Sequence, residues 1–346
     1  MQIDAILDRA LHDTPPSRDE CLGLLELQSD SLEAGLLRCV ADAVSRRRFG
    51  GEAMLFGQIG VETTACPGGC DFCVFGAGHV LVEPHELSSD EVVEKALAFT
   101  AGGDLHALFL MTMHEFDLHR LLALVQAVRA AIPPQTRLVL NTGDMTFEWA
   151  RALAAAGVHG IYHVCRLREG VDTRLDPVRR LATIEAIKAA GLDFVYCCEP
   201  IGPEHTDEEI VDQLLLGYEH GCSQHAAMRR VTVSQLPLGR HGQISELRLA
   251  QIVAVVALAG LGRPQMEMIG VHEPNVLGLT SGANAVFAET GANPRDTSAE
   301  TSAHRGLDVA AARAMLHEAG FRYLRLGDGR RVELTPEYMA EKAVRV

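Results

Sequence analysis

Several features that mark other protein classes are missing from this sequence. It contains no run of about 18 or more purely apolar residues, so no membrane-spanning helix is predicted. Basic residues are outnumbered, 31 Lys and Arg against 46 Asp and Glu, and the formal net charge is −15. This balance disfavours a surface that binds the phosphates of nucleic acid. No linker or low-complexity segment divides the 346 residues, so one large domain is favoured.

The cysteines also lack the pattern of a disulfide scaffold. Nine occur in a long chain that shows no signal peptide, which predicts a reducing, cytoplasmic location. Most of those outside one short loop are expected to be small buried hydrophobic residues. These six are Cys21, Cys39, Cys165, Cys197, Cys198 and Cys222.

The other three cysteines lie together after a strand-like run at residues 53–61. Cys66, Cys70 and Cys73 have the spacing C-x3-C-x2-C, and no fourth cysteine follows at short range. Three thiolates on one loop can hold three irons of an iron–sulfur cluster and leave one iron open to a small chelating molecule. The intervening Gly68–Gly69 pair is expected to supply the positive-φ turns that such a loop needs.

This spacing, with the aromatic Phe72 just before the third cysteine, resembles the radical S-adenosylmethionine (SAM) superfamily. The resemblance implies a [4Fe-4S] cluster on Cys66, Cys70 and Cys73, with S-adenosyl-L-methionine on the open iron. It also implies that one electron from the cluster cleaves SAM to a 5′-deoxyadenosyl radical, which takes hydrogen from a small substrate. An electron donor such as flavodoxin or ferredoxin is then an expected partner.

Zinc is the alternative metal for this loop. His79 follows closely and would complete a tetrahedral site with the three thiolates. Zinc knuckles usually carry a second pair of ligands, however, and a zinc hydrolase needs a two-histidine spacing that this sequence lacks. The cluster interpretation is therefore preferred.

Strand-like and helix-like segments alternate roughly every 30 residues from Glu52 onward, which predicts an α/β fold, a (β/α)8 TIM-type barrel. Alanine-rich helices that end in glycine support this interpretation. The predicted strands are 53–61, 105–112, 136–141, 160–165, 194–198, 230–236, 265–269 and 283–288. The predicted helices between them are 89–101, 117–132, 146–156, 177–190, 206–221 and 245–260.

Three parts are expected along the chain. Residues 1–50 form an N-terminal helical extension, 51–295 the barrel, and 296–346 a C-terminal helix and short hairpin that pack on the barrel. The hairpin is predicted around Gly327-Asp328-Gly329. The basic run Arg46-Arg47-Arg48 is expected to be a solvated helix face.

Reacting groups of such barrels lie at the carboxyl ends of the strands. After the second strand, the resemblance implies that Glu115 contacts the amino group of SAM; an exposed loop glutamate is the alternative. After the third strand, Asn141 is expected to face the ribose or the substrate. Helix capping by Asp144 or Thr146 is the alternative reason for polar residues there.

The segment after the fourth strand resembles the corresponding stretch of biotin synthase and its relatives. The resemblance implies that His163 and Arg166 hold polar groups of SAM or substrate, and that Arg180 binds the SAM carboxylate, which suits a guanidinium fork. A structural histidine and a solvent-facing arginine are the alternatives.

Two further segments resemble this group. Residues 199–206 are similar to a superfamily segment whose backbone packs against adenine, which implies that role for Ile201 and Gly202. Glu199 and Pro200 stand where glycines are usual. Residues 281–284 match an Ala-Gly-Ala-Asn-like segment, so the resemblance spans about residues 35 to 295.

Typical biotin synthase holds a second cluster deep in the barrel. By local alignment, one of its four ligand positions keeps a cysteine here, and ordinary biotin synthesis is therefore not expected. The corresponding positions are Leu110 or Met111, Asn141 or Thr142, Cys197 or Cys198, and Glu267 or Met268.

The favoured function is that of a radical SAM enzyme of cofactor or small-metabolite biosynthesis, as in methylornithine synthase. Sulfur insertion of the biotin or lipoyl synthase kind is the first alternative; it would use a second iron–sulfur cluster around Cys165, Cys197 and Cys198, or a partner enzyme or carrier protein. A non-catalytic iron–sulfur carrier is the second alternative.

Overall fold

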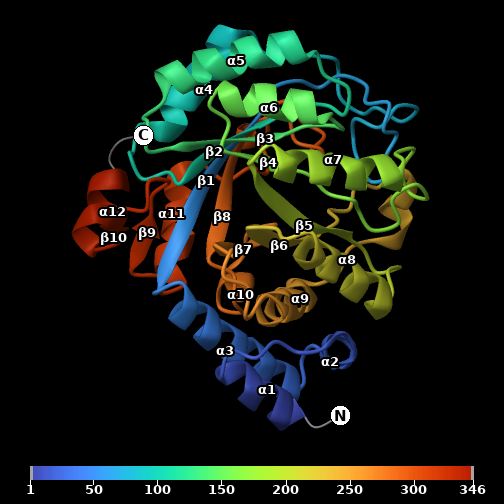
Figure 1. The fold of residues 1–346 in the computed structure, drawn as a ribbon, viewed down its shortest axis with the longest axis vertical. Coiled ribbons are helices and arrows are strands. Elements are labelled where there is room, and N and C mark those ends of the chain that lie inside the picture. The colour runs from blue at the N-terminus through green and yellow to red at the C-terminus, as the bar shows by residue number, and fades with distance from the viewer. Residues whose placement is uncertain (1–2, 344–346) are drawn as a thin grey trace.

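The computed structural model describes residues 3–343, which form a closed parallel barrel with helices outside it (Figure 1). Eight strands follow one another in chain order, and the first also pairs with the eighth. They are β1 (Glu52–Gly60), β2 (Ala107–Met111), β3 (Arg137–Asn141), β4 (Gly160–Tyr162), β5 (Asp193–Ile201), β6 (Gln224–Arg229), β7 (Met268–His272) and β8 (Ala285–Gly291). The predicted TIM-type barrel is confirmed.

The six helices predicted between the strands are present, with ends within two residues of the predicted ones. Side-chain caps explain this accuracy, because a Ser, Thr or Asp that binds the first free N–H groups is visible in the sequence. Ser88 and Thr206 each form a complete capping box. The helices are α4 (Ser89–Thr100), α5 (Leu118–Ala131), α6 (Phe147–Ala155), α7 (Pro177–Ala189), α8 (Asp207–Glu219) and α9 (Glu246–Ala259), and a short α10 (Val276–Leu279) follows β7.

Two of the predicted strands were misplaced. The β-branched run within 230–236 is a loop that leads to the 3₁₀ helix η1 (Pro237–His241), and β6 lies just before it. β6 begins with Gln224 and His225, whose polar side chains do not suggest a strand, yet both are buried. β7 starts three residues later than predicted, at Met268.

Three N-terminal helices, α1 (Ile3–Leu11), α2 (Arg18–Leu25) and α3 (Leu32–Arg48), cover the barrel on the side of α9 (Figure 1). Because α3 packs on α9 from outside, every residue from Leu249 to Ala259 is buried. The prediction of a solvated arginine face in α3 holds for Arg47, which is exposed, and is wrong for Arg46 and Arg48. Arg46 donates to the carbonyl of Ala319, and Arg48 donates to that of Gly260, so these side chains attach α3 to the barrel.

The C-terminal part contains η2 (Thr301–Ala303), α11 (Val309–Glu318), β9 (Tyr323–Arg325), β10 (Arg331–Glu333) and α12 (Pro336–Ala343). The predicted hairpin is confirmed: β9 runs parallel to the start of β1, and β10 pairs with β9. Its turn lies against the amino ends of β2 and β3, because a Cβ on Gly327 would come within 2.4 Å of the carbonyl oxygen of Gln135. No helix within residues 3–343 is long and apolar enough to cross a membrane.

The lower part of the barrel is filled by side chains. Phe56 and Phe287 stack with ring centroids 4.8 Å apart, and Phe109 meets Phe287 edge-on at 5.2 Å. Nearer the amino ends, Arg137 forms ion pairs inside the barrel with Asp193 and Glu267. A filled lower barrel leaves the carboxyl ends of the strands as the place for a site.

Candidate active site

The cysteine loop joins β1 to α4, and backbone hydrogen bonds hold it to the segments that follow β4 and β8. Within the loop, the N–H of Cys66 donates to Phe75, and that of Cys73 donates to Cys70. The bonds to other segments run from Asp71 to Asp172 at 2.9 Å, from Arg174 to Gly68 at 2.8 Å and from Val74 to Pro294 at 3.1 Å. The loop is therefore fixed over the mouth of the barrel by the segments after β4 and β8.

The glycine prediction is correct for one of the two residues. Gly69 has a φ of 52°, in the left-handed region that favours glycine. Gly68 does not adopt a positive φ. It is needed for a different reason, because a Cβ there would lie 3.3 Å from Leu175 and 3.4 Å from the Sγ of Cys66.

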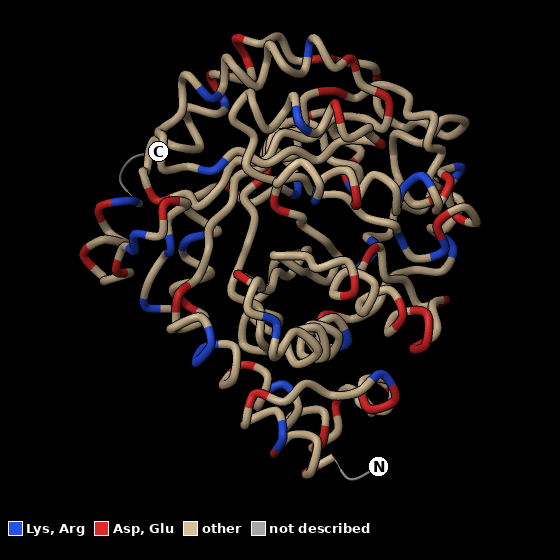
Figure 2. Tube along the Cα trace, in the orientation of Figure 1, with Lys and Arg blue, Asp and Glu red and all other residues tan. Residues whose placement is uncertain are grey.

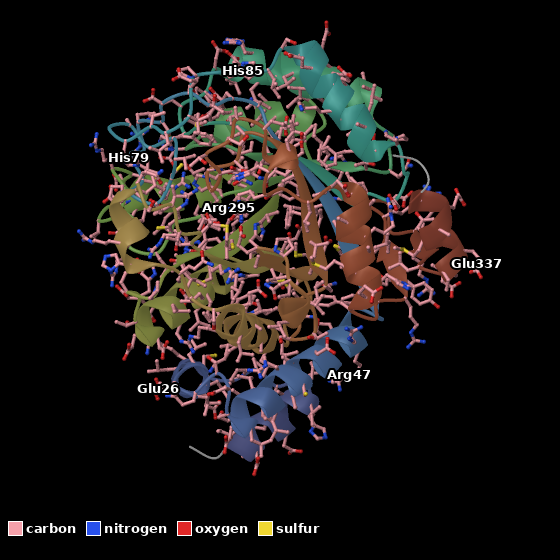
Figure 3. The ribbon with its side chains drawn as sticks, turned by 180° about the vertical axis from the view of Figure 1, so that it is seen from behind. Glu26, Arg47, His79, His85, Arg295 and Glu337 are labelled. Atoms are coloured by element: carbon pink, nitrogen blue, oxygen red, sulfur yellow. The ribbon has the colours of Figure 1, made fainter. Side chains whose placement is uncertain are left out.

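His79 does not point at the thiols. Its Nε2 lies 3.1 Å from the carbonyl oxygens of both Cys70 and Cys73, so the ring binds the backbone of the loop. Figure 3 places His79 at the outer edge of the molecule. His79 is therefore not placed to be the fourth ligand of a zinc ion on the three thiolates.

The donor set suits an iron–sulfur cluster. Within residues 3–343, no group of three His, Cys, Asp or Glu side chains is close enough together to hold a single metal ion. This is also true of Cys66, Cys70 and Cys73. A cluster of four irons binds one thiolate at each corner, so its ligands stand apart. Burial raises the pKa of Cys70 to about 11, and cluster binding would displace the thiol protons.

One cavity connects these cysteines to the carboxyl ends of the strands. Its empty volume is about 1120 Å³, the open mouth included. Inward-pointing residues at the ends of β1 to β7 line it, together with a residue that follows β8. They are Gln58, Met111, Asn141, Tyr162, Glu199, Met228, His272 and Arg295, beside Cys66, Cys70, Phe72 and Cys73.

Four of the eight predicted cofactor-binding residues reach this cavity: Phe72, Asn141, Arg166 and Arg180. Asn141 lies there as the last residue of β3, while the cap of α6 is made by Thr146. The polar residues of this segment thus have both expected roles: Asn141 lines the cavity and Thr146 caps α6.

The other four lie outside the lining. Glu115 is exposed, and its neighbour His114 lines the cavity instead. His163 is buried behind the wall, with Nε2 3.5 Å from Asp144 Oδ1, and burial lowers its pKa to about 3. Ile201 and Gly202 do not line the cavity, whereas Glu199 and Pro200 of the same segment do.

The two arginines of the cavity differ in how their nitrogens are used. Arg180 donates from Nη1 to Asp144 at 3.0 Å, and from Nε and Nη2 to the carbonyl of Val164 at 3.0 and 2.6 Å. Arg166 donates from Nε to Glu199 at 3.1 Å, and its Nη1 lies 3.9 Å from Glu169. The two Nη atoms of Arg166 therefore make fewer hydrogen bonds to the protein than those of Arg180.

Buried charges around these arginines are balanced. Burial alone would raise the pKa of Asp144, but contact with His163 and the charge of Arg180 hold it well below its usual value. Burial alone would lower the pKa of Arg166, but Glu199 and Glu169 hold it above its usual value. The carboxylate of Asp144 and the guanidinium of Arg166 are therefore charged at neutral pH.

Three residues that the sequence analysis did not propose as site residues also line the cavity: Tyr162, Glu199 and Arg295. Tyr162 donates its hydroxyl to Glu199, whose other oxygen accepts from Arg166. Arg295 lies near the middle of the barrel in Figure 3 and pairs with Glu289 at 2.6 Å and Glu273 at 2.9 Å. The alternation of inward-pointing positions along a strand could have found Tyr162 and Glu199, but not Arg295, which lies on the loop after β8.

The cysteines considered for a second cluster do not line the cavity. Cys197 and Cys198 are neighbours on β5, and neighbouring side chains of a strand point to opposite faces. The Sγ of Cys198 lies 3.8 Å from the carbonyl of Ile210 in α8, outside the barrel. Cys165 is buried, and burial raises the pKa of its thiol to about 11.

Comparison with known proteins agrees with this geometry. Residues 62–216, which include the three cysteines, Arg166 and Arg180, match the family model of the radical SAM superfamily. Residues 62–216 thus form a radical SAM domain. Such a domain supports an enzyme, and it implies a [4Fe-4S] cluster and SAM. No protein in a search of curated proteins matched the chain.

Two solved structures share the fold of this chain. The FeFe-hydrogenase maturase HydG from Carboxydothermus hydrogenoformans is 17% identical, with a TM-score of 0.74 over 93% of this chain and 79% of that one. Methylornithine synthase (PylB) is 18% identical, with a TM-score of 0.76 over 91% of this chain and 96% of that one. These neighbours share the fold over nearly the whole chain, beyond the range of the family model.

Proposed function

We propose that this enzyme uses a cluster on Cys66, Cys70 and Cys73 and bound SAM to remove a hydrogen atom from a small polar substrate, in the biosynthesis of a cofactor or metabolite. One observation carries the proposal: the three cysteines open into the same cavity as the inward-pointing residues at the strand ends. A substrate in that cavity would lie between the cysteine loop and the filled lower barrel.

When bound, the cluster and SAM supply the electron and the carbon radical for hydrogen abstraction. The chain's part is to hold both groups and to exclude water. Phe72 and Phe75 give the loop side of the cavity an apolar surface. A site closed to water limits side reactions of a radical.

Arg166 is the residue we propose for the SAM carboxylate, in place of Arg180. The hydrogen bonds of Arg180 to Asp144 and Val164 already use its three nitrogens. Arg166 lines the cavity and uses one nitrogen on Glu199. A guanidinium fork with a free end fits a carboxylate with two parallel hydrogen bonds.

The substrate is proposed to lie deeper, against Asn141, Tyr162 and His272. Burial and the charge of Arg295 lower the pKa of His272 to about 3, so its ring is neutral at physiological pH. A neutral imidazole both donates and accepts, and the Asn141 amide does the same. These groups suit a small substrate with hydroxyl, amide or amino groups.

A low-potential electron carrier and a reducing compartment, the cytoplasm, belong to the same proposal. All nine cysteines are unpaired in the structure, as a reducing compartment requires. The arrangement of Cys165, Cys197 and Cys198 gives no specific support to a second cluster, so sulfur insertion is not proposed.

Anaerobic reconstitution tests the proposed function. We expect about four irons per chain, and formation of 5′-deoxyadenosine after SAM and dithionite are added. Cys66→Ala should abolish both results, while Cys39→Ala, at an exposed cysteine outside the loop, should leave both unchanged. A full cluster in the intact chain without any 5′-deoxyadenosine would instead support a non-catalytic carrier.

A further inference from the structure

Three polar side chains at the strand ends face the cavity with few or no hydrogen bonds to the protein. Asn141 and His272 form no side-chain hydrogen bond to any described residue. Gln58 has only a long contact, 3.8 Å, from its Nε2 to the sulfur of Met111. Gln58 is 8% exposed and His272 is 7% exposed. Buried polar groups of folded proteins normally have partners, so these groups indicate a ligand that completes their hydrogen bonds.

The charged residues of the same cavity already have partners within the chain. Each of the four arginines that line it pairs with a carboxylate, in the pairs Arg166–Glu199, Arg180–Asp144, Arg230–Glu204 and Arg295–Glu289. In Figure 2 most of the barrel trace is tan, and basic and acidic positions occur together in the loops around it.

Two lining residues have charge that is not fully used by these pairs. The Nη atoms of Arg166 form no hydrogen bond to the described residues, and the proposed function gives them to SAM. Glu62 has no cation beside it, but its oxygens accept from the N–H of Met113 and the hydroxyl of Thr64. Among the lining residues, therefore, no charge remains for a charged group of the substrate.

Aromatic rings and thioethers form the apolar part of this region. The rings of Tyr162 and His272 have centroids 6.2 Å apart, and the His272 ring lies 4.4 Å from that of Phe287. Met111 and Met228 also line the cavity here. Such a surface covers the C–H groups of a ligand, while a few polar groups fix its orientation. We name Gln58, Asn141, Tyr162 and His272 the neutral subsite.

We propose that the neutral subsite binds an uncharged ring with several hydroxyl groups, a neutral sugar or cyclitol, as the substrate. The proposal rests on the proposed function and names the substrate class of the same cavity. Each hydroxyl both donates and accepts, which matches two amides and a neutral imidazole. The hydrogen atom removed in the proposed reaction must come from a saturated carbon. A ring of CH(OH) units offers several such carbons, whereas a flat aromatic heterocycle offers none.

A charged substrate is disfavoured by the same residues. A carboxylate, phosphate or ammonium group in a buried site needs an opposite charge beside it. An anion would have to displace a carboxylate from Arg166 or Arg295, and that carboxylate would be left buried without its cation. His272 cannot supply the charge, because burial and Arg295 lower its pKa to about 3.

The test uses the reconstituted enzyme with SAM bound and probes built on one ring size. Methyl α-D-glucopyranoside and myo-inositol are the neutral probes; D-glucuronate, D-glucosamine and D-glucose 6-phosphate are the charged ones. Anaerobic isothermal titration calorimetry at pH 7 measures their dissociation constants. We expect at least one neutral probe to bind saturably, and at least tenfold more tightly than each charged probe.

Matched variants locate the binding. Asn141→Ala and His272→Phe should each weaken binding of the neutral probe about tenfold or more, because each removes hydrogen bonds and His272→Phe keeps a ring in place. Gln126→Ala and His119→Phe, at exposed positions of α5, should bind it like wild type. Iron content is the control for the cluster. If His272→Phe loses iron, Gln58→Leu tests the same subsite from β1.

Three results would overturn the proposal. They are no saturable binding of either neutral probe, equal or tighter binding of a charged probe, and neutral-probe binding that is unchanged in the subsite variants. A preference for D-glucuronate would assign the free Nη atoms of Arg166 to the substrate.

The substrate class and the reaction can fail separately. Wild type that binds a neutral ring through these residues, but makes no 5′-deoxyadenosine with dithionite, would sustain the subsite and refute the reaction. Wild type that makes 5′-deoxyadenosine with dithionite, but prefers a charged probe, would sustain the reaction and refute the substrate class.

Discussion

Arg166 and Arg180 both line the cavity, yet they differ in how much of each guanidinium is already bound. Arg180 is 2% exposed and connects Asp144 to the carbonyl of Val164, which is a structural arrangement. Arg166 keeps its outer nitrogens toward the cavity. The two residues should therefore respond differently to the same substitution.

Arg166→Ala should weaken SAM binding by the reconstituted enzyme about 10- to 100-fold, because charge-assisted hydrogen bonds to the carboxylate are lost. Equilibrium dialysis with labelled SAM measures this, with iron content as the control for the cluster. Arg151→Ala, at an exposed position, should bind SAM normally. Unchanged affinity in Arg166→Ala would assign the carboxylate to another group.

Arg180→Ala should instead reduce stability, by about 3 kcal/mol, since it leaves the half-buried carboxylate of Asp144 without its cation. The midpoint of urea unfolding measures the loss. Removing both charges, with Asp144→Asn in the same chain, should recover part of it. A variant as stable as wild type would show that the pair is not structural.

His106 gives a prediction for pH. It is buried at the start of β2, donates from Nδ1 to the carbonyl of Arg325, and burial and the charge of Arg137 lower its pKa to about 3. The unfolded chain takes up this proton near pH 6.5 and the folded chain does not, so stability is full above about pH 6.5 and falls as the pH drops from there toward 3.

His106→Asn removes the imidazole that takes up this proton on unfolding. Its unfolding free energy should therefore depend less steeply on pH between 6 and 4.5, by at most about 1.4 kcal/mol per pH unit. Urea unfolding at several pH values measures the slope. Equal slopes for wild type and variant would mean that His106 is protonated in the folded chain.

The elements of the fold differ in how well the sequence predicts them. Helix ends were predictable because the caps are local, as Ser88 with Glu91 shows. β6 was not, since its polar first residues become buried only when Tyr196 and Tyr218 pack around His225. Which nitrogens of Arg166 are free also depends on Glu199, which lies 33 residues away in the chain. Such contacts are properties of the folded molecule.

The hairpin β9–β10 gives a prediction at the element scale. Gly327→Ala would place a Cβ 2.4 Å from the carbonyl of Gln135 and 2.5 Å from that of His106, so backbone must move and about 1–3 kcal/mol of stability should be lost. Gly35→Ala in α3, with nothing within 4 Å, should be neutral or stabilising. Thermal unfolding compares them, and equal melting temperatures would contradict the tight packing of the turn.

At the scale of the whole molecule, the barrel divides its interior into two levels. The lower level is filled by aromatic rings around Phe287 and by the ion pairs of Arg137. The upper level holds the cavity and is covered by the cysteine loop, which backbone bonds attach to the segments after β4 and β8. The spacing of the cysteines was enough to predict the chemistry, because a cluster motif is local, whereas the cavity required the closed barrel.

The most direct test of the account is electron paramagnetic resonance of the anaerobically reconstituted, reduced chain, recorded with and without SAM. The account predicts a [4Fe-4S]⁺ signal that changes when SAM is added, because SAM binds the iron that Cys66, Cys70 and Cys73 leave open. A signal from a full cluster that is identical with and without SAM, or zinc on the three thiolates in place of iron, would contradict it.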